Sequence, residues 1–342
     1  MEKRNLTAID LFSGCGGLSL GVKRAGFKVI GSVELDDLAA ETYKLNHPQT
    51  KVINKDITKV NAVALRRELG LEKGELDLLA GCPPCQGFSS MRTFNGKFEV
   101  QDERNDLIFQ FIKFIDAFVP KSVMMENVSG LYKDSRIDSF VRRLKRRNYN
   151  VKYDIFNAYD YGIPQRRKRL ILIASRVSEV EFAEKNKYKR NVKHAIANIE
   201  SVLESSDPLH NYPIETTDRI KKLISLIPKD GGSRTDLPDK FVLDCHKNYG
   251  GFKDVYGRMS WNSPAPTITG GCVNPSKGRF LHPEENRPIT LREAALLQGF
   301  PKGYKFSLRK GRTGAALMIG NAFPPNFVKK HAEILKNLIE NS

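Results

Sequence analysis

The stretch Ile9-Asp10-Leu11-Phe12-Ser13-Gly14-Cys15-Gly16-Gly17-Leu18-Ser19-Leu20-Gly21 begins as an apolar strand-like run, turns through a glycine-rich loop and continues as a helix-like segment. Small residues in such a loop let the backbone approach a ligand, and the start of a helix presents free N–H groups. The loop is not a strict G-x-G-x-x-G, because Ser19 occupies the place of the third glycine. Taken alone, it fits a cofactor site and a tight structural turn equally well.

Short apolar runs alternate with helix-like segments from residue 7 to residue 175. Such repeated units predict an α/β fold with a mostly parallel, twisted sheet and helices on both faces. The expected strands are Thr7–Phe12, Lys28–Glu34, Lys51–Ile53, Leu76–Ala80, Lys121–Glu126, Val151–Phe156 and Arg169–Ala174, and the expected helices include Asp37–Asn46, Asn61–Leu69, Asp106–Phe118 and Ile137–Arg147.

The pattern changes after Arg176, where proline, glycine, aspartate and asparagine become frequent. We therefore expect a first domain at residues 1–175 and a smaller, irregular β-rich domain at residues 176–285. Helical periodicity returns at Thr290–Gln298, with Thr290 and Glu293 in capping-box positions. Residues 286–342 are predicted to return to the first domain.

The formal net charge of the 342-residue chain is +17, which points to a polyanionic partner. The alternative is a solvated basic surface. Basic residues cluster at 142–152, 166–169 and 302–312. Nucleic acid is favoured over membrane, because no basic amphipathic anchor is present. Five cysteines form no disulfide pattern, and no segment is apolar enough to span a bilayer, so a cytoplasmic protein is expected.

Carboxyl side chains follow the glycine-rich loop at positions suited to an adenosine cofactor. The second expected strand ends at Glu34, about 20 residues after the loop, where a ribose-binding carboxylate belongs. Asp56 and Ile57 follow the third expected strand and suit an adenine ring. The alternative is that Glu34 and Asp56 are surface acids that cap helices. NAD and S-adenosylmethionine both fit this arrangement.

A rigid cysteine turn, Gly81-Cys82-Pro83-Pro84-Cys85-Gln86-Gly87-Phe88-Ser89, follows the fourth expected strand. The prolines stop the strand and place a thiol at the sheet edge where ligands bind. Glu126 ends the next strand, so nucleophile and carboxyl acid would face one pocket if the two strands are neighbours. The spacing Cys82-x-x-Cys85 also suits zinc or redox chemistry, but no second pair exists, so no metal is expected.

A basic row precedes the last expected strand. Gln165, Arg167 and Arg169 point to one side if this segment is extended, and such a row could grip a base oxygen and flanking phosphates. The alternative is a solvated basic turn.

Together these motifs resemble the DNA (cytosine-5)-methyltransferase family of bacterial and phage restriction–modification systems, over nearly the whole chain. The resemblance implies a Rossmann-like S-adenosylmethionine-dependent methyltransferase fold, with residues 1–175 as catalytic and cofactor-binding domain and residues 176–285 as target-recognition domain. The resembling segments are Asp10–Gly17, Gly81–Ser89, Glu126-Asn127-Val128, Gln165-x-Arg167-x-Arg169, Arg287–Pro301 and Gly320–Pro325.

The resemblance also implies roles. Cys85 would attack C6 of a flipped cytosine in a specific duplex sequence, Glu126 would protonate N3, and Arg167 and Arg169 would hold the base and its phosphate. The residues expected at S-adenosylmethionine are Phe12, Gly14, Gly16, Gly17, Leu18, Glu34, Leu35, Asp56, Ile57, Pro84, Leu107, Asn321 and Ala322, with Leu35 departing from the bulkier ring of many relatives. Those expected at DNA are Gln86, Ser89, Arg92, Gln165, Arg258, Thr267 and Thr269.

The expected partners are double-stranded DNA and a cognate restriction endonuclease acting on the same site, and the chain is expected to be monomeric. Three alternatives are a tRNA-methylating relative, a DNA-binding protein without activity and a nicotinamide oxidoreductase. The first lacks its Cys-Phe-Thr signature here. The second would not need Cys85, Glu126 and the basic row together.

Overall fold

The computed structural model describes residues 5–84, 107–212, 216–238 and 254–342. Cys85, Gln86, Ser89 and Arg92 lie outside the described residues, so their predicted roles are not tested by it. The chain divides into two compact units. Unit 1 comprises residues 1–161, 168–186 and 323–342, and unit 2 comprises residues 162–167 and 187–322.

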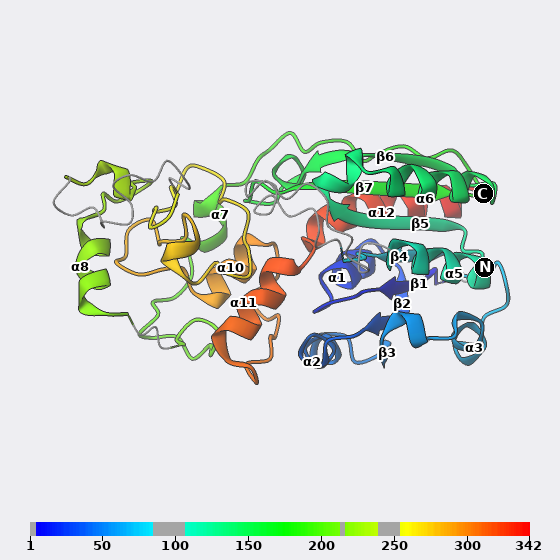
Figure 1. Cartoon of the computed structure of the whole chain (residues 1–342), viewed down its shortest axis with the longest axis horizontal. Helices are drawn as coiled ribbons and strands as arrows, with labels where there is room; N and C mark the ends of the chain where they lie inside the picture. Colours follow the sequence, from blue (N-terminus) through cyan, green and yellow to red (C-terminus); the bar gives the residue numbers. More distant parts are fainter. Residues whose placement is uncertain (1–4, 85–106, 213–215, 239–253) are drawn as a thin grey trace. The chain divides into compact units, whose positions relative to one another are not determined.

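Unit 1 is built on a seven-stranded sheet with the order β3-β2-β1-β4-β5-β7-β6 (Figure 1). The first five strands in that order run parallel, while β7 is antiparallel to both β5 and β6. The predicted α/β fold with a mostly parallel sheet is therefore confirmed. The strands are β1 Thr7–Leu11, β2 Lys28–Glu34, β3 Lys51–Asn54, β4 Leu78–Gly81, β5 Ser122–Val128, β6 Asn150–Asn157 and β7 Lys168–Ser175.

Apolar helix faces cover the sheet of unit 1. Phe111, Phe114 and Phe118 lie on one side of their helix at i, i+3 and i+7 and are buried in the same core as Ile9 and Leu11 of β1. The helical elements are α1 Gly17–Arg24, α2 Asp37–Asn46, η1 Ile57–Lys59, α3 Ala62–Glu68, α5 Ile108–Phe118, η4 Ser129–Lys133, α6 Ser135–Lys145, η5 Ala158–Tyr161 and α12 Pro325–Glu340.

Helix α12 packs directly on α1, although 302 residues separate Arg24 from Asn326, its hydrogen-bond partner. Gly21 makes this approach possible, because a Cβ atom there would lie 2.4 Å from both the Pro325 carbonyl oxygen and Val328 Cβ. The contact brings the segment after residue 322 back to the first unit.

Unit 2 is made of short helices and long irregular connections. The helices of its described part are α7 Val192–Ile196, α8 Asp218–Leu226, η6 Arg234–Asp236, η8 Pro275–Lys277, α10 Leu291–Leu297 and α11 Gly311–Asn321. The predicted β-rich character is wrong for the described part of this unit, which holds isolated bridges such as Arg258 to Leu281 in place of strands. The predicted capping box is confirmed: the Thr290 side chain accepts from the Glu293 N–H, and the Glu293 carboxylate accepts from the Thr290 N–H.

The unit boundaries differ from the predicted ones. Residues 176–186 belong to unit 1, and residues 162–167 belong to unit 2. The return to unit 1 occurs at Phe323, not at residue 286, because α10 and α11 pack within unit 2. A composition change marks where loops begin, but it does not show which core a later helix joins.

Candidate active site

Four strands of unit 1 bring the predicted chemistry to one edge of the sheet. In β1 and β4, Leu11 pairs with Gly81, and in β4 and β5, Gly81 pairs with Met125. Because these strands are parallel neighbours, the residues that follow them emerge at the same edge. From the sequence, Glu126 is expected beside the cysteine turn only if the fourth and fifth strands pair. The structure shows that they do.

The glycine-rich loop is held by the carboxylate at the end of β2. The Gly14 N–H donates to Glu34 Oε2 at 2.7 Å, and the Asp36 N–H donates to Glu34 Oε1 at 2.8 Å. Burial raises the pKa of Glu34 above its ordinary value. Glu34 thus lies against the loop itself rather than capping a distant helix.

The loop leaves open space where a ligand could approach. Gly14 has a φ of +53°, and a Cβ atom built on it would meet no atom of the described residues within 4 Å, its two chain neighbours aside. Phe12 also has a positive φ of 59°, which is costly for a residue with a side chain. Such strain at a non-glycine position is typical of a functional site.

The other residues predicted at the cofactor are distributed as follows. Asp56 is the N-cap of η1 and accepts from the Thr58 N–H at 2.9 Å, which lowers its pKa. Leu35 is 66% exposed. Leu107 is the N-cap of α5. In unit 1, Gly17, Leu18 and Ile57 are buried; in unit 2, Asn321 is exposed at the end of α11 and Ala322 is buried.

Sequence reasoning missed two side chains under this loop. Asp10 is buried at the end of β1 and accepts from the Ser19 hydroxyl at 2.6 Å, and burial raises its pKa to about 7. His47 Nε2 lies 3.2 Å from the Gly16 carbonyl oxygen, and its Nδ1 lies 3.1 Å from Lys23 Nζ. The signal for Asp10 was a charged residue inside an apolar strand. His47 gave none, because its approach to Gly16 depends on how α2 packs.

The described part of the cysteine turn is tied to both neighbouring strands. The Cys82 N–H donates to the Leu11 carbonyl at 3.2 Å, and Asn127 Nδ2 donates to the Pro83 carbonyl at 3.0 Å. Burial and the charge of Glu126 hold the pKa of the Cys82 thiol well above its ordinary value. Cys82 is therefore a neutral, packed thiol. Pro84 is half-buried and is the last residue described before the predicted nucleophile.

Glu126 is 7% exposed at the end of β5 and forms an ion pair with Arg169 of β7, with Nε and Oε1 2.9 Å apart. The antiparallel register, in which Val128 pairs with Arg169, places the guanidinium at this edge. The ion pair fixes the Glu126 carboxyl group near the end of β5.

The rest of the basic row is placed differently. Arg167 belongs to unit 2 and is 2% exposed, and its guanidinium donates to the carbonyls of Ile268 and Gly320, each at 3.0 Å. Gln165 has no exposed surface, and its amide oxygen accepts from the Ile268 N–H at 3.0 Å. These two side chains hold loops of unit 2 together, so the prediction that Arg167 and Gln165 grip the substrate is corrected to a structural role.

The predicted DNA contact at Arg258 is also corrected. Arg258 has no exposed surface, and its guanidinium donates to the carbonyls of Ile227, His282, Glu285 and Ile224. Burial lowers its pKa. A side chain enclosed by carbonyls is not available to a phosphate.

Two threonines remain as predicted DNA contacts. Thr267 is half-buried and donates to the Arg166 carbonyl at 2.7 Å, whereas Thr269 is exposed.

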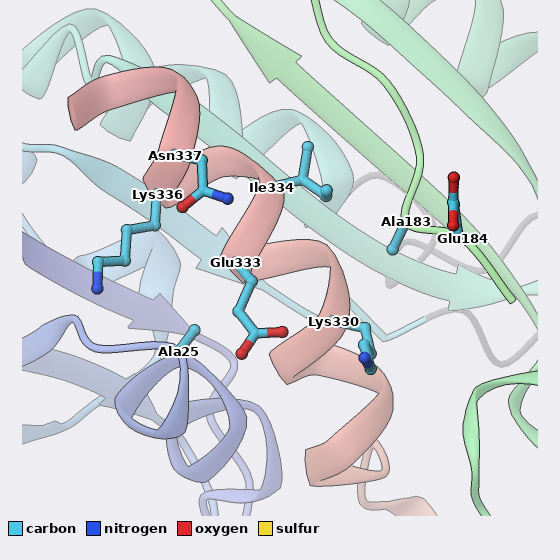
Figure 2. A pocket seen from close by; sticks show the side chains of 8 residues that line it. All are labelled: Ala25, Ala183, Glu184, Lys330, Glu333, Ile334, Lys336 and Asn337. Atoms are coloured by element: carbon cyan, nitrogen blue, oxygen red, sulfur yellow. The ribbon is translucent and has the colours of Figure 1, made fainter. Parts of the chain in front are cut away.

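A cavity of about 450 Å³ in unit 1 lies on α12 and contains none of the predicted site residues (Figure 2). Its walls come from α12, the end of α1 and the segment around Ala183. Among the described residues, no three histidine, cysteine or carboxylate side chains gather closely enough to hold a metal ion. No helix within the described ranges is long and apolar enough to cross a membrane.

Comparison with known proteins agrees with this arrangement. The profile of the family described as C-5 cytosine-specific DNA methylase matches residues 6–337. The chain belongs to the C-5 cytosine-specific DNA methylase family. The protein is thus a DNA (cytosine-5)-methyltransferase, and its predicted family resemblance is confirmed.

Several individual relatives are similar to this methylase along its whole length. It is 33% identical to the Type II methylase M.HgiDII of Herpetosiphon aurantiacus, over 97% of this chain and 95% of that protein. It is 32% identical to the Type II methyltransferase M1.HphI of Haemophilus parahaemolyticus, over 98% and 88% of the two chains. A solved structure described as a DNA modification methyltransferase encoded within a prophage of E. coli superposes with a TM-score of 0.73, at 26% identity, over 98% of this chain and 100% of that chain.

Proposed function

We propose that this methylase transfers a methyl group from S-adenosylmethionine to C5 of a flipped cytosine in a specific double-stranded DNA sequence, through a covalent bond between Cys85 and C6. The observation that carries the proposal is the Glu126–Arg169 pair, because it lies at the end of the strand next to the one that leads into the cysteine turn. Family membership supports the same reaction.

The residues at the loop fit S-adenosylmethionine. The open side of Gly14 and the strained backbone of Phe12 leave room for the cofactor, and Glu34 presents a carboxylate for hydroxyl groups. Asp56 and Ile57 offer a polar and an apolar contact for a base. We expect the remaining predicted residues of unit 1, including Leu107, to complete this pocket. When bound, the cofactor supplies an electrophilic methyl group.

Cytosine C5 is a weak nucleophile until a group adds at C6. The Cys85 thiolate forms a bond to C6, and the electron pair of the C5–C6 double bond moves toward N3, which takes a proton from the acid form of Glu126. C5 would then take the methyl group, and the bond between that group and the cofactor sulfur would break, which releases S-adenosylhomocysteine. N3 would return its proton to Glu126. A base would remove the proton from C5, and the electron pair left there would restore the C5–C6 double bond as the Cys85–C6 bond breaks and the thiolate is regenerated. The target atom lies inside the stacked duplex, so the base must leave the stack first.

Glu126 is the acid, and Arg169 positions it. The Arg169 guanidinium holds the Glu126 carboxyl in place between turnovers, and approach of the base replaces that contact with N3. Among the basic row, we therefore keep Arg169 at the reacting group and assign Arg167 to the support of unit 2.

The test is incubation of tritiated S-adenosylmethionine with bacterial DNA and, separately, with tRNA. We expect label in DNA only, located by bisulfite sequencing at one sequence. Label in tRNA only, or in neither, contradicts the proposal. Cys85→Ser should abolish transfer while cofactor binding persists. Cys82→Ser is the matched control and should retain transfer, because a thiol whose pKa is held well above its ordinary value stays neutral and is not a nucleophile.

The names of the relatives support one proposal about a partner protein. Type II names of the similar proteins favour a restriction endonuclease that cuts the same site. DNA methylated by this enzyme should resist that nuclease, and cleavage of fully methylated DNA contradicts the pairing. We also propose that the enzyme acts as a monomer, which light scattering at working concentration tests directly.

A further inference from the structure

The carboxyl-terminal end of α6 carries exposed cations that the proposed reaction does not use. Arg142, Arg143, Lys145 and Arg146 are all exposed, and Lys113 of the neighbouring α5 is exposed as well. Nearby cations differ from these: Arg147 pairs with Asp116, and Lys152 pairs with Glu181. Within the part of the chain that the structure describes, these five cations form no ion pair.

This basic end lies at the edge of the sheet opposite to the candidate active site. Asn150, which follows α6, begins β6 and pairs with Ser175, and Ser175 also pairs with Ser122 at the start of β5. The Tyr149 hydroxyl donates to the Pro120 carbonyl just before β5, at 2.5 Å. Six residue steps of β5 separate this edge from Val128, which is about 20 Å of extended chain.

Helix stability alone does not account for the cluster. Cations near a helix C-terminus interact favourably with the helix dipole, each by about 0.3 to 1 kcal/mol. However, Arg142 and Arg146 are i,i+4 neighbours, and Arg142 and Lys145 are i,i+3 neighbours, so each added cation also repels another. One cation of the group packs on an aromatic ring, since Arg143 Cζ lies 4.8 Å from the Phe109 ring centre. Its guanidinium is thereby held in a defined position.

We propose that the α6 basic end, defined as Lys113, Arg142, Arg143, Lys145 and Arg146, is a second DNA-binding surface that contacts phosphates outside the recognition site. The inference rests on the proposed function for its choice of DNA as the polyanion. Duplex DNA carries about one negative charge per 1.7 Å, which matches a dense, unpaired cluster of this kind. The contact carries no sequence information. The contact therefore keeps the enzyme bound to long DNA while it searches for its recognition site.

The experiment compares the full-length enzyme with two fourfold variants. In the first, Arg142, Arg143, Lys145 and Arg146 are each changed to Gln. The matched control changes Lys28, Lys44, Arg67 and Lys73 to Gln; these are exposed cations spread over other elements of unit 1, and the same charge is removed. Cofactor affinity of each variant, measured by calorimetry, confirms that the protein is folded.

Binding to a 60-base-pair duplex without a target site is measured by fluorescence anisotropy over a series of salt concentrations. Four lost phosphate contacts should reduce the slope of log K against log salt by about 3 to 4 and weaken binding about tenfold or more. The control should change affinity less than about threefold. Equal effects of the two variants overturn the proposal, because they would report net charge only.

Methylation of long DNA relative to short duplexes gives the second readout. The α6 variant should lose kcat/KM on plasmid DNA more than on a 16-base-pair substrate, and an equal loss on both contradicts a surface outside the site. If the wild-type enzyme transfers no methyl group at all, the proposed function fails, while the anisotropy comparison still decides the α6 surface.

Discussion

Arg169 Nε lies 2.9 Å from Glu126 Oε1, and this ion pair joins β7 to β5 at the edge where the reaction is proposed to occur. Both side chains are largely enclosed, with 16% and 9% of their side-chain surfaces exposed. The ion pair therefore fixes the carboxyl group of Glu126 and the guanidinium of Arg169 in one position at this edge.

Replacing Glu126 by Gln should lower kcat for methyl transfer by about 100-fold to 10,000-fold, which is the usual range for a general acid. Gln preserves the shape of the side chain but cannot donate a proton from a carboxyl group. Single-turnover rates with saturating DNA measure the effect. Cofactor affinity should be unchanged, and a variant that loses cofactor binding and rate in equal measure would contradict the assigned role.

Arg167→Met should destabilise unit 2 by about 2 to 4 kcal/mol, because the buried carbonyls of Ile268 and Gly320 lose their donor. Trp261 is the only tryptophan of the chain and belongs to unit 2, so its fluorescence during urea unfolding measures this change. The slope of DNA affinity against salt should remain as in the wild type. Normal stability combined with a reduced slope would instead restore Arg167 as a phosphate contact.

Gly14→Ala should weaken S-adenosylmethionine binding about tenfold, because the new methyl group enters the open side of the loop and the positive φ of +53° becomes strained. Gly70→Ala is the matched control. Gly70 has a φ of +69°, and its Cβ position is also open, but it follows α3 and lies outside the loop. Calorimetry should show a change in cofactor affinity for the first variant alone, and equal losses would mean that strain, not the ligand, is responsible.

Acid should weaken the fold through His331 of α12. Its ring is packed among Phe156, Tyr161, Phe182 and Phe327, and burial lowers its pKa from 6.5 to about 4. Between those two values the unfolded chain binds a proton that the folded chain does not, so stability is complete above pH 6.5 and falls as the pH is lowered toward 4. The full loss is about 3 kcal/mol.

The measurement for His331 is the unfolding free energy of wild type and His331→Phe at several pH values between 7 and 4. The variant should depend less steeply on pH over this range. His47, whose pKa burial also lowers to about 4, contributes to the dependence that remains in both proteins. If the unfolding free energies of the two proteins change equally with pH, His331 is not the group responsible.

The sheet and the acid could be predicted from the sequence because their signals are local. Apolar runs that end in Glu34, Gly81 and Glu126 predicted strands followed by candidate site residues. The pairing of β4 with β5 places the cysteine turn and Glu126 at one edge of the sheet. The burial of Arg167 and Arg258 could not be predicted, because an arginine in a loop looks the same whether it faces phosphates or carbonyls. That difference depends on contacts with residues far away in the chain, such as Gly320.

The contact between α1 and α12 has a consequence for biosynthesis. Its two sides are separated by 302 residues at the Arg24–Asn326 hydrogen bond. At about 5 to 20 residues per second, a ribosome needs about 15 to 60 s to produce the second side after the first. During that time the face of α1 around Gly21 is not covered by α12. All residues of unit 2 are synthesised in the same interval. We expect nascent chains in this window to depend on a chaperone that shields α1 and to aggregate when its supply is limited.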